Sequence, residues 1–301
     1  MLKILLILLL FLPSLSIAAD DAEDDPLGDL IQDIIKKEKS GKKEETPAKT
    51  QPEKPKNETG QTKKAKPEPA RKQEPKQQTT KKKTNKIIVI DPGHGGKDPG
   101  TVNGKLYEKD IVLRLAKKIR EVSKKYKGIE VRLTRGRDIF LELAERAKIA
   151  NRLEGDLFIS LHVNSFKDKN TGGMELYHLD NTRNEYSVKL ASVENRISGD
   201  VSTLDMILID MDLSYYIDDS LSYASTIAKN INKDLSGYKI KLRDYRKGAL
   251  FYVLVGARMP SLLFEVGYIT NPNDRALLQN DKFLEALART LLDSIAETKL
   301  K

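Results

Sequence analysis

Apolar residues after position 86 gather in short continuous runs and in longer stretches with helical spacing. The short runs predict strands over 87–90, 130–133, 157–161, 174–177 and 262–266. Apolar positions three and four residues apart predict helices over 109–125, 141–153, 220–235 and 281–299. Because the predicted strands and helices alternate, we expect one α/β domain over residues 87–301, with a mostly parallel, twisted sheet flanked by helices.

The first 19 residues form an apolar segment of a different kind. Lys3 and the amino terminus precede an unbroken apolar run of nine residues, 4–12, and the small residues Ser16, Ala18 and Ala19 follow it. This order is typical of a cleavable export signal, cut after Ala18 or Ala19. A bilayer core needs about 20 apolar residues, so we expect no transmembrane anchor after cleavage; an uncleaved anchor is the alternative.

Two segments without the pattern of a folded core separate this signal from the domain. Residues 20–39 are acidic and include PLGDLIQDIIKK, residues 26–37, whose apolar positions share one helical face. An isolated helix this short is marginal, so the motif either packs nowhere or docks on a partner. Residues 40–86 consist mainly of Lys, Glu, Pro, Gln and Thr, and their only aliphatic side chains are three alanines. That composition predicts a disordered tether.

The net charge of +9 invites a nucleic-acid interpretation, so its location matters. The segment 40–86 holds fifteen Lys or Arg and six Glu, an excess of nine, and the charges of all other residues cancel. This segment has no aromatic side chain to stack on bases. We therefore expect a spacer with a weak attraction to anionic polymers and no nucleic-acid partner.

The chain contains no cysteine, which excludes disulfides, a thiol nucleophile, cysteine-ligated zinc and iron–sulfur clusters. Any metal must then be held by His, Asp or Glu.

His94, in the glycine-rich turn IVIDPGHGG, and His162, in DLFISLHVNS, both come at the ends of predicted strands. Ligand sites in open α/β sheets collect at that edge. The alternatives are an incidental surface histidine at 94 and a hydrogen-bonded core histidine at 162; His178, at the end of a predicted edge strand, is expected to be structural.

Two carboxylates stand out among the many surface acids. Glu108 opens the first predicted helix, where capping of the helix dipole would alone explain it. Glu265 lies inside a buried apolar strand, where a charged group needs a metal, a cation or a catalytic reason. Two His and one Glu, with a fourth position left for water, are typical of a catalytic zinc site. Zinc lowers the pKa of bound water to about 7, and a second carboxylate can then take its proton.

Four motifs in order carry a resemblance to a known family: IVIDPGHGGKDPGTVNGKLYEKDIVLRLAKKI, LTRGRDIFLELAERAKIAN, DLFISLHVNS and GARMPSLLFEVGYITNPND. Residues 87–299 resemble the zinc-dependent N-acetylmuramoyl-L-alanine amidases of the type-3 family, which cleave bacterial peptidoglycan. The resemblance implies that His94, Glu108 and His162 bind Zn²⁺ and that Glu265 is the catalytic carboxylate. It also implies the bond that is cut, the amide between the lactyl group of N-acetylmuramic acid and the L-alanine of the stem peptide. Departures at Ser165 and over 268–270 are chemically mild.

A long segment follows the predicted strand 174–177. Residues 187–213 are apolar in the middle and long for a plain connection. Their sequence resembles the division-linked amidases of Gram-negative bacteria, in which an insertion blocks the zinc site until an activator protein binds. By that resemblance Glu194 approaches the zinc and takes the place of water; an ordinary exposed glutamate on a helix is the alternative.

These observations together predict a monomeric, exported zinc amidase that acts on peptidoglycan in the periplasm during cell-wall remodelling and daughter-cell separation. In a cell without an outer membrane the enzyme would instead be secreted or wall-associated. Two rival interpretations keep the same fold: a catalytically silent wall-binding or activator protein, and a zinc peptidase that cuts within the stem peptide. Zinc content and the masses of the released products distinguish the three.

Overall fold

A computed structural model describes residues 85–180, 185–195 and 203–300, and gives the backbone alone over 203–215. The predicted signal peptide, acidic segment and tether all lie outside the described residues. Within the described part of the chain, none of the helices combines the length and the apolar character that a membrane crossing requires.

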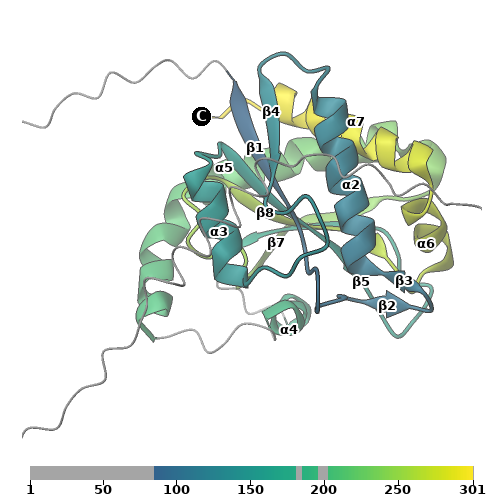
Figure 1. The fold of residues 1–301 in the computed structure, drawn as a ribbon, viewed down its shortest axis with the longest axis horizontal. Coiled ribbons are helices and arrows are strands. Elements are labelled where there is room, and N and C mark those ends of the chain that lie inside the picture. Colours follow the sequence, from purple (N-terminus) through teal and green to yellow (C-terminus); the bar gives the residue numbers. More distant parts are fainter. Residues whose placement is uncertain (1–84, 181–184, 196–202, 301) are drawn as a thin grey trace, which may run out of the picture.

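The centre of the domain is a six-stranded sheet with the order β4-β1-β5-β8-β6-β7 (Figure 1). Neighbouring strands run parallel except for β6 and β8, which are antiparallel. The strands are β1 (Lys86–Pro92), β4 (Ile129–Leu133), β5 (Leu157–Asn164), β6 (Met174–Leu179), β7 (Leu242–Ala249) and β8 (Ser261–Tyr268), with a small hairpin of β2 (Val102–Asn103) and β3 (Leu106–Tyr107) beside them. The helices are α2 (Glu108–Ser123), α3 (Leu143–Arg152), α4 (Glu185–Glu194), α5 (Thr203–Asp234), α6 (Pro272–Leu278) and α7 (Asp281–Glu297), with a short 3₁₀ turn, η2 (Ser236–Tyr238).

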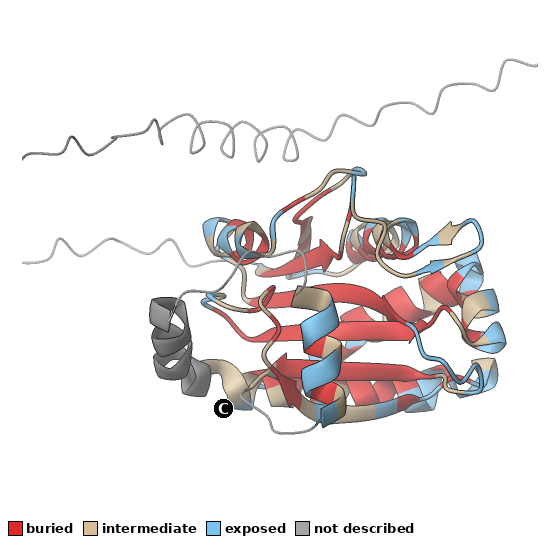
Figure 2. Ribbon diagram, turned by 90° about the horizontal axis from the view of Figure 1, so that it is seen from below, coloured by how far each residue is buried: buried red, intermediate tan, exposed pale blue. Residues whose placement is uncertain are grey.

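Helices cover the two faces of the sheet unequally. On one face α2, α5 and α7 pack against the larger hydrophobic cluster, which includes Ile90, Ile159 and Phe264. On the other face a smaller cluster holds Phe158 and Leu263 under α3, α4 and the segment 249–259. The central strands are buried on both faces (Figure 2). Burial on both faces explains why these strands are continuous apolar runs instead of alternating ones.

The predicted α/β class, the parallel sheet between helices and all five predicted strands are confirmed. One expectation was wrong, because the strand at 174–177 is not an edge strand: β7 pairs with β6 and forms the edge. The sequence of β7, LRDYRKGA, is polar and carries no strand pattern, since an edge strand buries few of its side chains. The helix predicted over 220–235 begins at Thr203, so the second part of the segment 187–213 belongs to α5.

The parallel strands β1, β5 and β8 bring their carboxyl ends to the same edge of the sheet. His94 follows β1, His162 lies near the end of β5, and Glu265 lies in β8 as the register partner of His162. Glu108 reaches the same edge as the first residue of α2. The fold therefore brings together four residues that are far apart in the sequence.

Removing one ring from the larger cluster tests its contribution to stability. Phe264→Ala is expected to lower the free energy of unfolding by about 3–5 kcal/mol, because Phe264 is fully buried and the sheet cannot close the cavity. Denaturant unfolding measures this change. Val102→Ala, at a side chain that is 49% exposed, is the control and is expected to change stability by at most about 0.5 kcal/mol. Equal effects of the two substitutions would contradict the assignment of the core.

Candidate metal centre and active site

His94 lies at the tip of the glycine-rich turn that leaves β1. Its backbone has φ of +58°, a left-handed conformation that costs a residue with a side chain on the order of 1–3 kcal/mol. Its Nδ1 lies 2.7 Å from Asp98 Oδ2, which leaves Nε2 to face the interior of the site. A proton on Nδ1 bound to a carboxylate fixes the ring and keeps Nε2 available as a ligand atom.

Two buried arginines hold this turn in place. Arg146 donates hydrogen bonds to the carbonyl oxygens of Pro92 and His94 at 3.0 and 2.9 Å, and it pairs with the buried carboxylate of Asp91 at 3.0 Å. Arg135 donates to the carbonyl of Gly93 at 2.7 Å and to that of Lys109 at 3.1 Å. Since Lys109 follows Glu108 in α2, Arg135 ties the histidine turn to the helix that carries Glu108. The conformation of His94 is thereby maintained by groups outside the turn.

Glu108 uses both carboxylate oxygens on backbone donors from other segments. Its Oε2 accepts from Thr101 N and its Oε1 from Val163 N, both at 2.7 Å, and the side chain is fully buried. These bonds orient Oε1 toward the two histidines, so the side chain does more than cap the helix.

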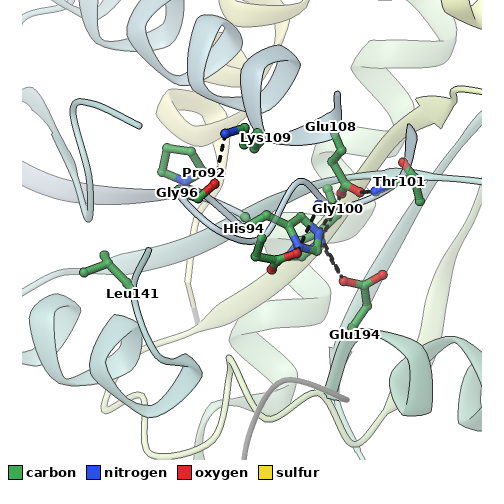
Figure 3. Close-up of polar contacts among 12 residues, drawn as sticks. Pro92, His94, Gly96, Gly100, Thr101, Glu108, Lys109, Leu141 and Glu194 are labelled. Atoms are coloured by element: carbon green, nitrogen blue, oxygen red, sulfur yellow. Dashed lines mark hydrogen bonds and ion pairs between the residues drawn. The ribbon is translucent and has the colours of Figure 1, made fainter. Parts of the chain in front are cut away.

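The two histidines meet two carboxylates in a compact group, in which Figure 3 shows His94 beside Glu108 and Glu194. His94 Nε2 lies 3.1 Å from Glu108 Oε1 and 3.5 Å from Glu194 Oε2. His162 Nδ1 lies 3.3 Å from Glu108 Oε1 and 3.0 Å from Glu194 Oε2. The imidazole rings are edge to face, with centroids 4.9 Å apart. Two imidazole nitrogens thus face the same small space between two carboxylate oxygens.

The carboxylates make this space strongly attractive to positive charge. Burial lowers the pKa of His94, but the charge of Glu108 and hydrogen bonds to Asp98 and Glu108 outweigh it and raise the pKa to about 10. Burial likewise opposes a charge on His162, and the charges of Glu194 and Glu108 raise its pKa to about 10. Burial also disfavours the charged form of Glu108, yet the two histidines hold its pKa well below the usual value.

The donor atoms fit a metal ion. His94 Nε2, His162 Nδ1 and Glu194 Oε2 are buried and have no hydrogen-bond partner among the described residues. One candidate ligand group, consisting of His94, His162 and Glu194, has donor atoms within 4.8 Å of one another. Glu108 Oε1 lies 3.1 and 3.3 Å from the same two nitrogens. We call His94, Glu108, His162 and Glu194 together the metal cage. Two imidazoles and a carboxylate are a donor set that suits divalent transition metals.

Glu265 lies beside this cage without a partner. Its side chain is buried, and neither carboxylate oxygen has a hydrogen bond within the described residues. Burial and the negative charges of Glu194, Glu108 and Glu175 raise the pKa of Glu265 well above its usual value. A carboxyl group that is this poorly solvated and this basic can accept a proton from a nearby group and release it again.

Glu194 comes from α4, on the less covered face of the sheet. The helix buries only Ser187 and Ala191 within its length. Next to Glu194, Asn195 accepts from Tyr252 N at 2.9 Å and donates to the carbonyl of Leu250 at 2.8 Å, which fixes the end of the helix to the segment after β7. Leu190 and Tyr186 also pack partly against the smaller hydrophobic cluster. Glu194 therefore reaches the histidines from a helix that is attached by a short apolar face and by polar contacts.

The structure brings together all five residues that the sequence singled out: His94, Glu108, His162, Glu194 and Glu265. His178 lies apart from the metal-ligand group of the described residues; its Nε2 is 3.9 Å from Asp180. Sequence reasoning missed Asp98, Arg135 and Arg146, which position His94. The signal for the arginines was faint, since Arg135 and Arg146 resemble the charged surface residues around them. Asp98, four residues after His94, lies within the glycine-rich turn itself.

Comparisons with known proteins agree on one family. The family model described as N-acetylmuramoyl-L-alanine amidase matches residues 88–297. The amidase AmiA of Escherichia coli is 33% identical over 222 residues, which cover 70% of this chain and 75% of AmiA. The catalytic domain of the amidase CwlV from Bacillus (Paenibacillus) polymyxa is 29% identical with a TM-score of 0.53, over 71% of this chain and 99% of that one. An amidase from Clostridium difficile 630 is 27% identical with a TM-score of 0.55, over 71% and 96%.

A methyl group at Gly93 tests the tight contact between the turn and His162. A Cβ there would lie 2.7 Å from His162 Cε1 and Nε2 and 2.8 Å from the carbonyl oxygen of Leu161. Gly93→Ala is therefore expected to displace the imidazole and weaken binding of a divalent metal, with Zn²⁺ as the probe, on the order of 10- to 100-fold. Competition with a chromogenic chelator measures the affinity. Gly237→Ala, where a Cβ meets nothing within 4 Å, is the control; equal Zn²⁺ affinities for the two variants would contradict the geometry.

Proposed function

Because the chain belongs to the N-acetylmuramoyl-L-alanine amidase family, we propose that it hydrolyses the amide bond between N-acetylmuramic acid and L-alanine in peptidoglycan, with zinc as its metal. The observation that carries the proposal is the group of His94, Glu108 and His162 beside the unpartnered carboxyl group of Glu265. We propose that this reaction contributes to cell-wall remodelling and to the separation of daughter cells, as the sequence predicts.

His94, Glu108 and His162 would hold the zinc ion. Glu108 suits a permanent ligand because two backbone N–H groups fix it inside the protein, whereas Glu194 comes from a peripheral helix. When bound, the ion supplies a Lewis acid that polarises the scissile carbonyl and acidifies water.

Glu265 then transfers a proton from the attacking water to the leaving amine. Its free carboxylate takes a proton from the attacking water as the new carbon–oxygen bond forms, and it gives this proton to the amide nitrogen as the carbon–nitrogen bond breaks. The products are a lactyl carboxylate on the sugar and a free amine on L-alanine. Because water is the nucleophile, the mechanism needs no covalent enzyme intermediate.

Exchanging the carboxylate at 265 for an amide tests this role. Glu265→Gln keeps the size of the side chain but removes its basicity, so the turnover rate should fall on the order of 10²- to 10⁴-fold while Zn²⁺ binding is retained. The assay digests purified cell-wall sacculi with each protein, with zinc and with chelator, and identifies products by mass. Free stem peptides identify the amidase, trimmed glycopeptides would show a stem-peptide peptidase, and no release by zinc-loaded wild type would show a silent binder. Equal release by wild type and Glu265→Gln would remove Glu265 from the mechanism.

We further propose that α4 inhibits the enzyme through Glu194. Glu194 Oε2 lies against both histidine nitrogens, in the place where a water molecule or the substrate must enter. An activator protein would relieve the inhibition by drawing the segment 187–213 away from the site. Consistent with the export signal expected from the sequence, we propose that the enzyme acts in the periplasm, where peptidoglycan is available.

Removal of the Glu194 carboxylate tests the inhibition. Glu194→Ala is expected to raise the rate of sacculus digestion, by about tenfold or more, because the ligand position becomes free for water. Glu185→Ala, at the other end of the same helix, is the control and is expected to leave the rate unchanged. The proposal would be wrong if folded, zinc-loaded Glu194→Ala digested sacculi no faster than wild type. The same result for a protein that lacks residues 187–213 would also contradict it.

A further inference from the structure

A second polar cluster lies beside Glu265, on its own strand and on the two neighbouring strands. Its members are Asn164 of β5, Glu175 of β6 and Tyr268 of β8, which we call the cradle. Glu175 is the register partner of Glu265, which in turn pairs with His162, and Asn164 pairs with Tyr268. Paired residues on neighbouring strands have Cα atoms about 4.5–5.5 Å apart and point to the same face. The cradle therefore flanks the catalytic carboxylate on the face that carries the metal cage.

The cradle is a buried and pre-organised structure. Asn164, Glu175 and Tyr268 are each at most 5% exposed. Glu175 Oε1 accepts from Lys247 Nζ at 2.8 Å, and Glu175 Oε2 accepts from the hydroxyls of Tyr177 at 2.9 Å and Tyr268 at 3.1 Å. Burying a carboxylate at this depth costs several kcal/mol per ion unless partners compensate. In the mechanism described above, Glu175 acts only through the effect of its charge on Glu265, and Asn164 and Tyr268 have no role.

The hydroxyl of Tyr186 occupies the cradle. Its oxygen lies 2.7 Å from Tyr268 Oη and 3.3 Å from Glu175 Oε2, and it accepts from Asn164 Nδ2 at 3.1 Å. Tyr186 belongs to α4, the helix that also carries Glu194. One helix thus fills two neighbouring places, the open side of the metal cage and the cradle. If Glu194 must leave for catalysis, movement of α4 can empty the cradle as well.

We propose that the cradle is a substrate subsite, which binds the peptide amide that follows L-alanine, and that Tyr186 occupies it in place of substrate. The inference rests on the proposed amidase function and on the displacement of α4. The cradle offers a donor, the side-chain Nδ2–H of Asn164, and acceptors, the Glu175 carboxylate and the Tyr268 oxygen. A peptide amide presents the matching carbonyl and N–H, and a phenolic hydroxyl imitates both because it donates and accepts. A carboxylate in the same position would lie against Glu175, so the subsite favours an uncharged group.

The spacing agrees with this assignment. Neighbouring strands lie about 4.7–4.9 Å apart, and an extended peptide advances about 3.3 Å per residue, so the cradle lies within one to two residues of the scissile bond. Beyond Tyr186, a cavity of about 500 Å³ is lined by Asn164, Phe166, Tyr186 and Thr270 among others. This cavity has room for the rest of the stem peptide.

The test compares two soluble substrates that differ only in one N–H group, which an oxygen atom replaces. One is N-acetylmuramoyl tripeptide, and the other is its depsipeptide analogue, in which an ester replaces the amide after L-alanine. In the Glu194→Ala background, the amide substrate should have a kcat/KM about tenfold higher than the ester, because only the amide donates a hydrogen bond to the charged Glu175. Tyr186→Phe, which keeps the ring but vacates the cradle, should lower KM for the amide severalfold with kcat unchanged.

Variants of the cradle separate recognition from folding. Glu175→Gln and Tyr268→Phe should each reduce the amide preference toward one, and a ratio of two substrates is insensitive to the fraction of protein that is folded. Asn151→Ala, a matched control that loses bonds to Gly256 and Arg258 on another loop, should keep the preference. No preference in the Glu194→Ala parent, or an undiminished preference in both cradle variants, would overturn the inference. Failure to cleave either substrate would instead overturn the proposed amidase function.

Discussion

Two backbone N–H groups, those of Thr101 and Val163, hold the buried carboxylate of Glu108 against the nitrogens of His94 and His162. A buried carboxylate is stable only with such partners. Three elements at this edge of the sheet contribute to the arrangement. Strand β5 supplies His162 and the N–H of Val163, α2 starts at Glu108, and the turn after β1 carries His94 and Thr101. The position of the metal cage thus follows from satisfying one buried negative charge.

The same edge keeps Glu265 in a contrasting environment. Glu108 accepts hydrogen bonds and faces cations, so its charge is favoured, whereas Glu265 has no hydrogen-bond partner in the described part of the chain and lies among other acids. Two glutamates a short distance apart are therefore suited to opposite tasks, one to binding a cation and the other to exchanging a proton. The difference comes from their surroundings, since the side chains are identical.

The sheet and the principal site residues could be predicted from the sequence because apolar runs bury on both faces and because ligands collect at strand ends. His94 and His162 were recognisable by their positions after strands, while the assignment of Glu108 to the cage needed the family resemblance. Other features left no local signal. The polar strand β7 owes its place to pairing with β6, and the cradle is formed by Asn164, Glu175 and Tyr268 from three strands. Such groups acquire their roles only through long-range register, which a single sequence does not display.

Helix α4 buries few side chains, and this affects the free energy that holds it against the site in the resting protein. The helix buries two small side chains, packs Tyr186 and Leu190 partly against the smaller hydrophobic cluster, and makes polar contacts through Tyr186, Glu194 and Asn195. If each polar attachment contributes about 1 kcal/mol net, these contacts favour the bound position of α4 by about 3 kcal/mol. The apolar packing of Tyr186 and Leu190 adds to this, so at most on the order of one molecule in a hundred has the helix displaced at any moment. The resting enzyme would then be a mixture with a small active fraction, and a partner must supply at least about 6 kcal/mol of differential binding energy to reverse the populations.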